Sequence, residues 1–162
     1  MFLKILTEPN PILRQVGKEL TLVEIGSKKI KKFIKDLTES MYIQDGAGIA
    51  APQVGESIKL CIIAKNFTPT GEKDLVLINP VWEKKSLIKT LDEEGCLSVP
   101  GIWGLVKRYK KIKVKALDEN GNKICFEVEN FPARVIQHEV DHLNGILFID
   151  KAKKLRQAEK TM

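Results

Sequence analysis

Histidine and cysteine are scarce in this 162-residue chain, which contains two histidines and three cysteines. No apolar run approaches the roughly 20 residues that a membrane-spanning helix needs, so we expect no membrane segment. The opening residues form too short an apolar stretch for a signal peptide. An odd number of cysteines without a signal peptide argues against a disulfide framework. We therefore expect a cytoplasmic protein whose thiols are reduced.

The net charge of +6 comes mainly from lysines in three stretches, at residues 28–35, 107–115 and 151–160. Solvated faces of helices and strands are the simpler interpretation of such stretches. The alternative is attraction to a polyanion such as ribosomal RNA, because basic clusters bind nucleic acid with little regard to sequence. No aromatic-rich RNA-binding signature accompanies the lysines. We leave a ribosome contact open and expect no DNA partner.

The first clear secondary-structure signal is an amphipathic helix. Ser27 offers an N-cap to a segment whose apolar residues recur at helical spacing from Ile30 to Met41, and the pattern stops near Asp45 and Gly46. The opposite face is rich in lysine. This pattern predicts one soluble helix, buried on a single side.

Short β-rich runs follow at residues 59–64 and 75–78 and predict strands. Apolar residues then alternate with charged ones at 112–116 and again at 124–128, with Asn120 and Gly121 between them. Such alternation around an Asn-Gly turn predicts a half-buried antiparallel hairpin.

A second helical pattern begins at Asn130, tolerates Pro132 in its first turn and stops at Gly145. It is apolar on more than one side, which is typical of a buried helix. We expect a single α+β domain over residues 1–162, with antiparallel strands packed around this central helix. Residues from about 150 to 162 read as a short basic tail.

Both histidines lie in one His-Glu-x-x-His pattern, with Glu139 between them. Residues four apart share a face of a helix, so His138 and His142 can turn toward one ion. Glu139 lies on the adjoining flank, where it can reach a water at the ion without being a ligand. Two surface histidines that fall at this spacing by chance are the weaker alternative.

Two histidines leave a catalytic metal site one protein ligand short. The metalloprotease pattern that adds a third histidine is excluded because Phe148 stands at that position, and Glu159, the one downstream glutamate, lies among lysines. Cys96 is the favoured ligand because glycines and prolines around it predict a shaped, irregular backbone. Cys61 falls in an apolar run and Cys125 on a charged strand face. A Cys/His/His set with an open fourth position suits a catalytic ion.

A third segment, from Gly46 to Gly55, packs glycines and small residues directly after the first predicted helix. No Gly-Lys-Ser/Thr follows, so it does not match a phosphate-binding loop. Such a loop suits close backbone approach to a peptide-like substrate, with Gln53 projecting an amide donor.

Three motifs now stand in order: Gly-Ala-Gly-Ile-Ala-Ala-Pro-Gln-Val-Gly from Gly46, Glu-Gly-Cys-Leu-Ser from Glu94, and Gln-His-Glu-Val-Asp-His-Leu-Asn-Gly from Gln137. Together they resemble the peptide deformylase family, as does the stretch Pro9 to Arg14. The resemblance implies a hydrolase that removes the N-formyl group from the N-terminal methionine of newly made proteins and releases formate. Its partners would be N-formylmethionyl nascent peptides, in a bacterium or, alternatively, in an organelle or phage.

By this resemblance, Cys96, His138 and His142 would bind one divalent metal ion, with Fe(II) as the cellular ion. Zinc, nickel or cobalt would be accepted by the same ligands in purified protein, and neither composition nor spacing decides between them. Glu94 and Arg108 match a structural ion pair of the family.

The resemblance also implies the remaining roles. Glu139 would move the proton from the attacking water to the departing amine. The Gln53 amide and the backbone N–H of Leu97 would stabilise the negative oxygen, and Gly48 would offer a backbone group to the substrate. The methionine pocket is assigned to three residues: Val135, Phe131 and Ile49. Arg134 falls where an apolar pocket residue would be expected.

Two alternatives remain beside this interpretation. One is another His-Glu-x-x-His metallopeptidase, and the other is a catalytically silent ribosome-associated binding protein. The C-terminus is shorter than in common bacterial members, which continue into a longer basic helix. Its cations would either contact the ribosome or form a solvated end: Lys151, Lys153, Lys154, Arg156 and Lys160.

Overall fold

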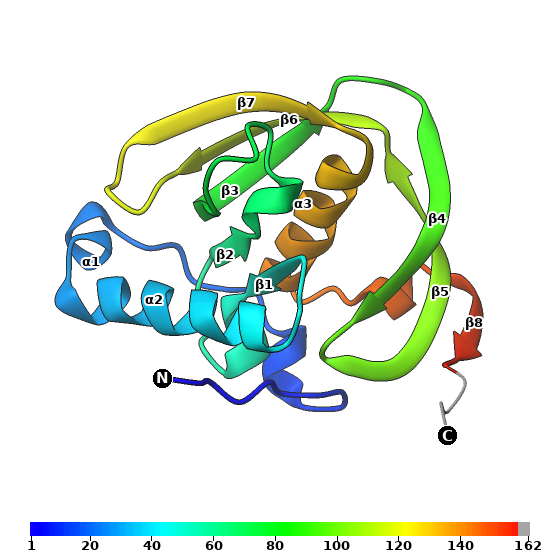
Figure 1. Cartoon of the computed structure of the whole chain (residues 1–162), viewed down its shortest axis with the longest axis horizontal. Coiled ribbons are helices and arrows are strands. Elements are labelled where there is room, and N and C mark those ends of the chain that lie inside the picture. Colours follow the sequence, from blue (N-terminus) through cyan, green and yellow to red (C-terminus); the bar gives the residue numbers. More distant parts are fainter. Residues whose placement is uncertain (159–162) are drawn as a thin grey trace.

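Two antiparallel sheets curve around one central helix in the computed structural model, which describes residues 1–158 (Figure 1). The first sheet has the order β1-β2-β3-β6-β7, and the second has the order β4-β5-β8. The predicted α+β class is confirmed. The strands of the first sheet are β1 (Gly48–Ala50), β2 (Leu60–Ile63), β3 (Leu75–Lys84), β6 (Lys111–Leu117) and β7 (Lys123–Glu129). Those of the second are β4 (Lys89–Cys96), β5 (Val99–Tyr109) and β8 (Lys153–Gln157).

The central helix is α3 (Asn130–Leu143), and it contacts strands of both sheets. Ten of its residues are buried, among them Ile136 and Leu143, which join strand residues in one apolar cluster. Figure 1 shows α3 enclosed by β6 and β7 on one side and by β4 and β5 on the other. A helix that is apolar on several sides must be covered on those sides, and its place between the two sheets provides this, as its sequence predicted.

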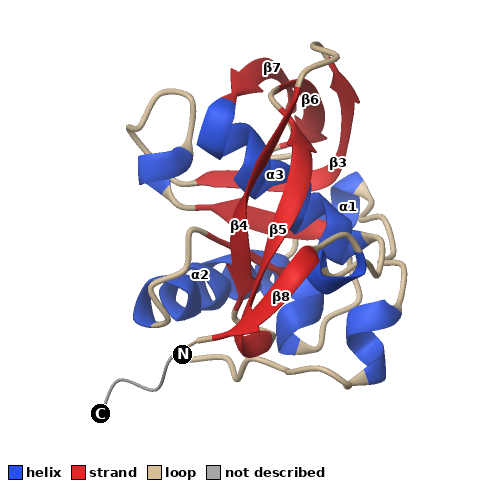
Figure 2. Cartoon of the chain, turned by 90° about the vertical axis from the view of Figure 1, so that its right-hand side faces the viewer, coloured by secondary structure: helices blue, strands red, loops and turns tan. Residues whose placement is uncertain are grey.

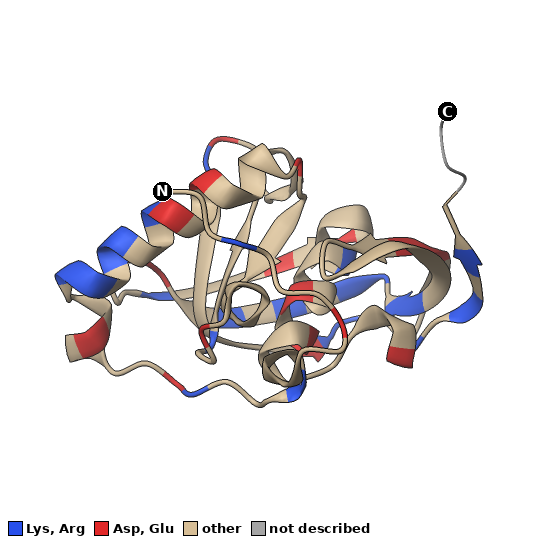
Figure 3. Cartoon of the chain, turned by 90° about the horizontal axis from the view of Figure 1, so that it is seen from below, with Lys and Arg blue, Asp and Glu red and all other residues tan. Residues whose placement is uncertain are grey.

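The long helix on the outside is α2 (Lys28–Ile43), preceded by the single turn α1 (Leu22–Ile25). The Ser27 hydroxyl accepts a hydrogen bond from the Ile30 N–H, which confirms the predicted N-cap. Leu37 and Met41 are fully buried against the first sheet, while lysines cover the outer face (Figure 3). The predicted helix is therefore present, and it ends two residues beyond Met41.

The predicted hairpin is also present, as β6 and β7 paired in antiparallel register. Gly121 in its turn has a φ of +80°, a conformation that glycine adopts without strain. The strand predicted to end at residue 78 instead continues to Lys84 through a register shift between Ile78 and Val81. At this irregularity the Asn79 side chain accepts a hydrogen bond from the Leu20 N–H and donates one to the Leu20 carbonyl.

Three strands of the second sheet were not predicted. Residues 89–93 of β4 are all exposed, and charged residues occur on both faces of the strand, so no apolar alternation marks it. Figure 2 shows β4 beside β5 in the second sheet. The irregular backbone expected around Cys96 is instead the end of β4 and its tight turn into β5. Residues Lys153–Gln157, read as a tail, form β8 and pair with β5. Glu159 and Lys160 lie outside the described residues.

Four short 3-10 helices join these elements: η1 (Pro11–Arg14), η2 (Ala51–Val54), η3 (Lys65–Phe67) and η4 (Phe148–Asp150). Among residues 1–158, no helix combines the length and the apolar character that a membrane crossing requires.

Gly145, two residues after the last residue of α3, provides a direct test of this packing. Its φ is +74°, and an added Cβ would lie 2.4 Å from the Arg14 carbonyl oxygen. We expect Gly145→Ala to lower the free energy of unfolding in urea by more than about 2 kcal/mol, because backbone strain and a collision add. Gly101→Ala is the matched control, since its φ is +76° with nothing within 4 Å. Equal losses in the two variants would contradict the packing argument.

Candidate metal centre

The three predicted ligands meet although they come from distant parts of the chain. His138 and His142 lie one turn apart on α3, and Cys96 ends β4. Their ligand atoms all lie within 4.8 Å of one another, and the Cys96 Sγ is 3.3 Å from the His142 Nε2. The helix sets the spacing of the two imidazoles, and the turn between β4 and β5 positions the Cys96 thiol beside them.

The surroundings of these three residues fit a divalent ion. The Nδ1 of His138 bonds the Glu94 carboxylate at 2.8 Å, which leaves its Nε2 for a metal. Among the described residues, the His142 Nδ1 and the Glu139 Oε2 are buried without hydrogen-bond partners. A thiolate with two imidazoles is a donor set that zinc and other first-row ions accept, at bond lengths of about 2.0–2.3 Å.

The other two cysteines lie apart from this group. Cys61 is fully buried in β2, and burial raises the pKa of its thiol, so it stays protonated and inert. Cys125 is exposed on β7. Cys96 is thus the one cysteine of the described residues grouped with both histidines.

A buried ion network stands directly behind His138. Glu94 is 6% exposed and accepts two hydrogen bonds from Arg108, each at 2.9 Å. Burial alone would raise the pKa of Glu94, but the bonds from Arg108 and His138 outweigh it and hold that pKa far below its usual value. Glu94 is therefore a fixed negative charge that orients the imidazole.

Arg134, which was expected to be out of place in an apolar pocket, belongs to the same network. Its guanidinium donates to Glu94 at 2.7 Å and to the Val106 carbonyl at 2.9 Å. A second arm reaches the Thr90 carbonyl at 2.8 Å. Its buried charge is thereby used to hold α3 against β4 and β5.

Glu139 lies beside the three ligands, with a side chain that is 4% exposed. Its fit depends on Gly48 in β1, because an added Cβ there would lie 2.9 Å from both the Cγ and the Oε1 of Glu139. Burial raises the pKa of Glu139 to about 7. A carboxyl group in this state can both take up and release a proton near neutrality.

Gln53 is held with its amide nitrogen toward Cys96. Its Oε1 accepts a hydrogen bond from the Ala50 N–H at 2.9 Å. Its Nε2 then donates to the Ser98 hydroxyl at 3.2 Å and lies 3.6 Å from the Cys96 Sγ. The side chain is a buried, oriented donor, and its partner Ser98 was not indicated by the sequence.

A cavity of about 500 Å³ opens onto this group. Val135 and Phe131, one and two turns before His138, line it, and so do Gly48 and Leu97. Ile49 does not, because alternation along β1 turns its fully buried side chain into the core against α2. Trp103 is a lining residue that no sequence pattern indicated, and it packs so closely on Gly95 that a Cβ there would be 2.8 Å from its ring.

Comparison with known proteins gives the same assignment over nearly the whole chain. The family model described as polypeptide deformylase matches residues 2–158. A peptide deformylase from Desulfotalea psychrophila is 44% identical over 157 residues, covering 96% of this chain and 90% of the relative. One from Syntrophomonas wolfei is 44% identical over 153 residues, covering 94% and 95%.

Solved structures agree with this. The crystal structure of peptide deformylase from Thermotoga maritima superposes with a TM-score of 0.86 at 37% identity, covering 95% of this chain and 99% of that one. The Met-Ala-Ser-bound enzyme from Acinetobacter baumannii has a TM-score of 0.86 at 35% identity, covering 93% and 98%. The resemblance noted in the sequence is confirmed, and the chain belongs to the polypeptide deformylase family of hydrolases.

Proposed function

We propose that this chain hydrolyses the N-formyl group of N-formylmethionyl nascent peptides with one divalent ion held by Cys96, His138 and His142. The observation that carries the proposal is the grouping of these three ligand atoms within 4.8 Å beside the buried carboxyl of Glu139. The cavity at this group has an apolar wall, formed in part by Phe131 and Val135, that suits a methionine side chain. The structure of the A. baumannii relative with Met-Ala-Ser, a deformylated sequence, supports this substrate class.

Glu139 is the general base and then the general acid of the reaction. A bound ion supplies Lewis-acid activation of water at neutral pH. Glu139 takes one proton from the attacking water as the water oxygen bonds the formyl carbon. The carbon–nitrogen bond then breaks, and Glu139 returns that proton to the departing amine. The products are formate and a free amino terminus.

Gln53 and Leu97 stabilise the oxygen of the formyl group as it gains negative charge. The Gln53 Nε2 already points toward the ligand cluster, and Leu97 follows Cys96 in the cavity wall. Donors fixed in this way are most effective where water is excluded, and one of them is worth roughly 2.7–4 kcal/mol in the transition state.

The rest of the substrate binds as an extended strand between two sheet edges. β1 ends the order of one sheet and β4 ends the order of the other, and residues of both edges line the cavity. Edge strands offer unpaired backbone groups to an added peptide. Gly48 offers such a group, and its missing side chain leaves room for Glu139.

Fe(II) is the cellular ion in this proposal. Zinc, nickel or cobalt replaces it in purified protein, since the ligand set accepts all four ions and occupancy follows supply. Similar bacterial relatives support a bacterial cytoplasm as the location. The net charge of +6 and the exposed lysines of β8 support a ribosome contact.

The activity is tested by formate release from a formyl-Met-Ala-Ser peptide, with protein purified and loaded with Fe(II) without oxygen. We expect Glu139→Gln to lower kcat about 10²–10⁴-fold while still binding one equivalent of metal, because the amide cannot accept the proton. Glu72→Gln, in an exposed turn, is the control and should match the unmodified chain. Full activity in Glu139→Gln would refute the assigned role, and an inactive, fully metallated unmodified chain would refute the function.

Gln53→Ala tests the amide donor. We expect kcat to fall about 10²–10³-fold, with a smaller change in KM, because the donor acts on charge that develops in the transition state. Ser98→Ala removes the hydroxyl that Gln53 bonds but keeps the donor, and should stay within a few-fold of the unmodified chain. A loss in Ser98→Ala as large as that in Gln53→Ala would show that only the local structure matters.

The ribosome contact is tested by co-sedimentation with ribosomes. We expect the variant Lys153→Glu/Lys154→Glu, in β8, to pellet less than the unmodified chain, because phosphate contacts are electrostatic. Lys28→Glu/Lys29→Glu, at the start of α2, changes the net charge equally and is the control. If both variants pelleted with ribosomes as much as the unmodified chain does, β8 would not be part of the contact.

A further inference from the structure

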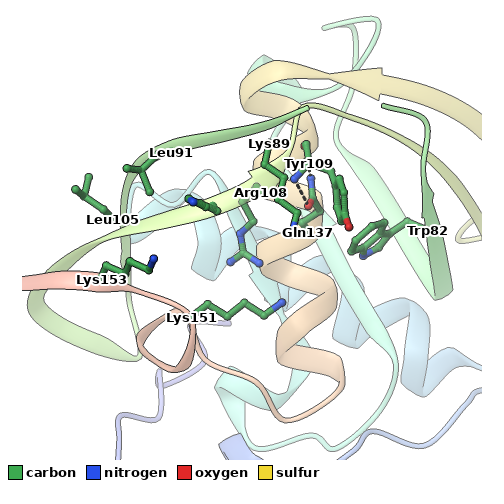
Figure 4. A pocket seen from close by; sticks show the side chains of 10 residues that line it. Trp82, Lys89, Leu91, Leu105, Arg108, Tyr109, Gln137, Lys151 and Lys153 are labelled. Carbon is green, nitrogen blue, oxygen red and sulfur yellow. Dashed lines mark hydrogen bonds between the residues drawn. The ribbon is translucent and has the colours of Figure 1, made fainter. Parts of the chain in front are cut away.

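A second cavity, of about 330 Å³, lies on the other side of the Glu94–Arg108 pair (Figure 4). Arg108 lines this second cavity, whereas Glu94 lines the cavity at the proposed metal site. None of the described residues that line it is a carboxylate. Five of them are cations: Lys89, Lys107, Arg108, Lys151 and Lys153.

These cations are only partly neutralised. Lys151 pairs with Asp141 at 3.0 Å, but within residues 1–158 neither Lys107 nor Lys153 has an ion pair. Arg108 is buried and already paired with Glu94 and Asp141, so the unpaired positive charge of the cavity comes from its lysines. A concave surface with unneutralised charges of one sign focuses its field and attracts ligands of the opposite sign.

The far end of the cavity is aromatic. The rings of Trp82 and Tyr109 lie edge to face with centroids 5.9 Å apart, and the Lys89 ammonium lies 4.7 Å above the Tyr109 ring. Figure 4 shows Lys153 at one end of the cavity, Arg108 and Lys151 in its middle and Trp82 at the other end. Cations followed by an aromatic platform match a phosphate chain that carries a planar base.

We propose that this cavity binds single-stranded RNA, with backbone phosphates on Lys107 and Lys153 and one unpaired base on Trp82. The aromatic end favours RNA over an acidic protein, since bases stack on aromatic rings and carboxylates do not. The basic surface continues past the cavity to Lys84, 5.7 Å from the Tyr109 ring, which favours a strand over a free nucleotide.

This inference deepens the proposed ribosome contact by giving it a place and a ligand chemistry, but its test does not depend on ribosomes. Absence of RNA binding overturns the inference whatever the ribosomes show. Loss of pelleting with ribosomes beside intact RNA binding removes only the ribosome proposal.

The test is fluorescence anisotropy of a labelled eight-nucleotide oligo(U) titrated with the full chain at several salt concentrations. The variant Lys107→Gln/Lys153→Gln should bind about tenfold more weakly, and the slope of log affinity against log salt should fall by roughly 1.4, because two phosphate contacts are lost. Lys28→Gln/Lys31→Gln on α2 carries the same charge change and should bind as the unmodified chain does. Formate release should be unchanged in both variants, which shows that they are folded.

A second variant separates a base from a simple polyanion. Trp82→Ala should weaken RNA binding several-fold but leave binding of polyglutamate unchanged, since only RNA offers a base to stack. Equal losses of RNA affinity in the cavity variant and the α2 control would overturn the proposal. Binding of polyglutamate as tight as that of the RNA would also overturn the proposal, because the occupant would then be an acidic protein. Equally tight binding of AMP would overturn it too, because the occupant would then be a free nucleotide.

Discussion

The structure depends on one buried carboxylate, that of Glu94. It lies on β4 and accepts hydrogen bonds from Arg108 on β5 and from Arg134 and His138 on α3. Four buried charges balance in this network, because Asp141 also pairs with Arg108. Breaking a buried pair leaves an uncompensated charge, which typically costs about 3–5 kcal/mol. The same contacts therefore close the second sheet onto the central helix and set the orientation of His138, a proposed metal ligand.

Close packing restricts the residues beside the proposed metal site as much as their chemistry does. Glu139 approaches β1 so closely that Gly48 admits no side chain, and Trp103 lies against Gly95 in the same way. Burial then gives the Glu139 carboxyl a pKa of about 7, which suits it to proton transfer. Gly48 and Gly95, which both belong to the sequence motifs, thus leave room for the side chains of Glu139 and Trp103.

Helices α2 and α3 and the β6–β7 hairpin could be predicted from the sequence because their apolar residues recur at regular helical or alternating spacing. The strands β4 and β8 could not, since both are exposed and mostly charged, and their pairing partner β5 is recognised only in three dimensions. The grouping of Cys96 with His138 and His142 could be predicted from the His-Glu-x-x-His spacing, the surroundings of Cys96 and the family resemblance. Ile49, assigned to the pocket from the resemblance, lies in the core against α2, because the register of β1 turns its side chain to that face. Trp103 was not predicted because no sequence motif contains it.

The most direct test of this account is the metal affinity of Glu94→Gln, measured by competition with a chelator on protein whose circular dichroism shows it to be folded. If Glu94 orients His138, zinc should bind about 10–100-fold more weakly than in the unmodified chain, because the hydrogen bond behind the ligand loses its charge. Zinc affinity equal to that of the unmodified chain would contradict the account and reduce the network to a purely structural contact.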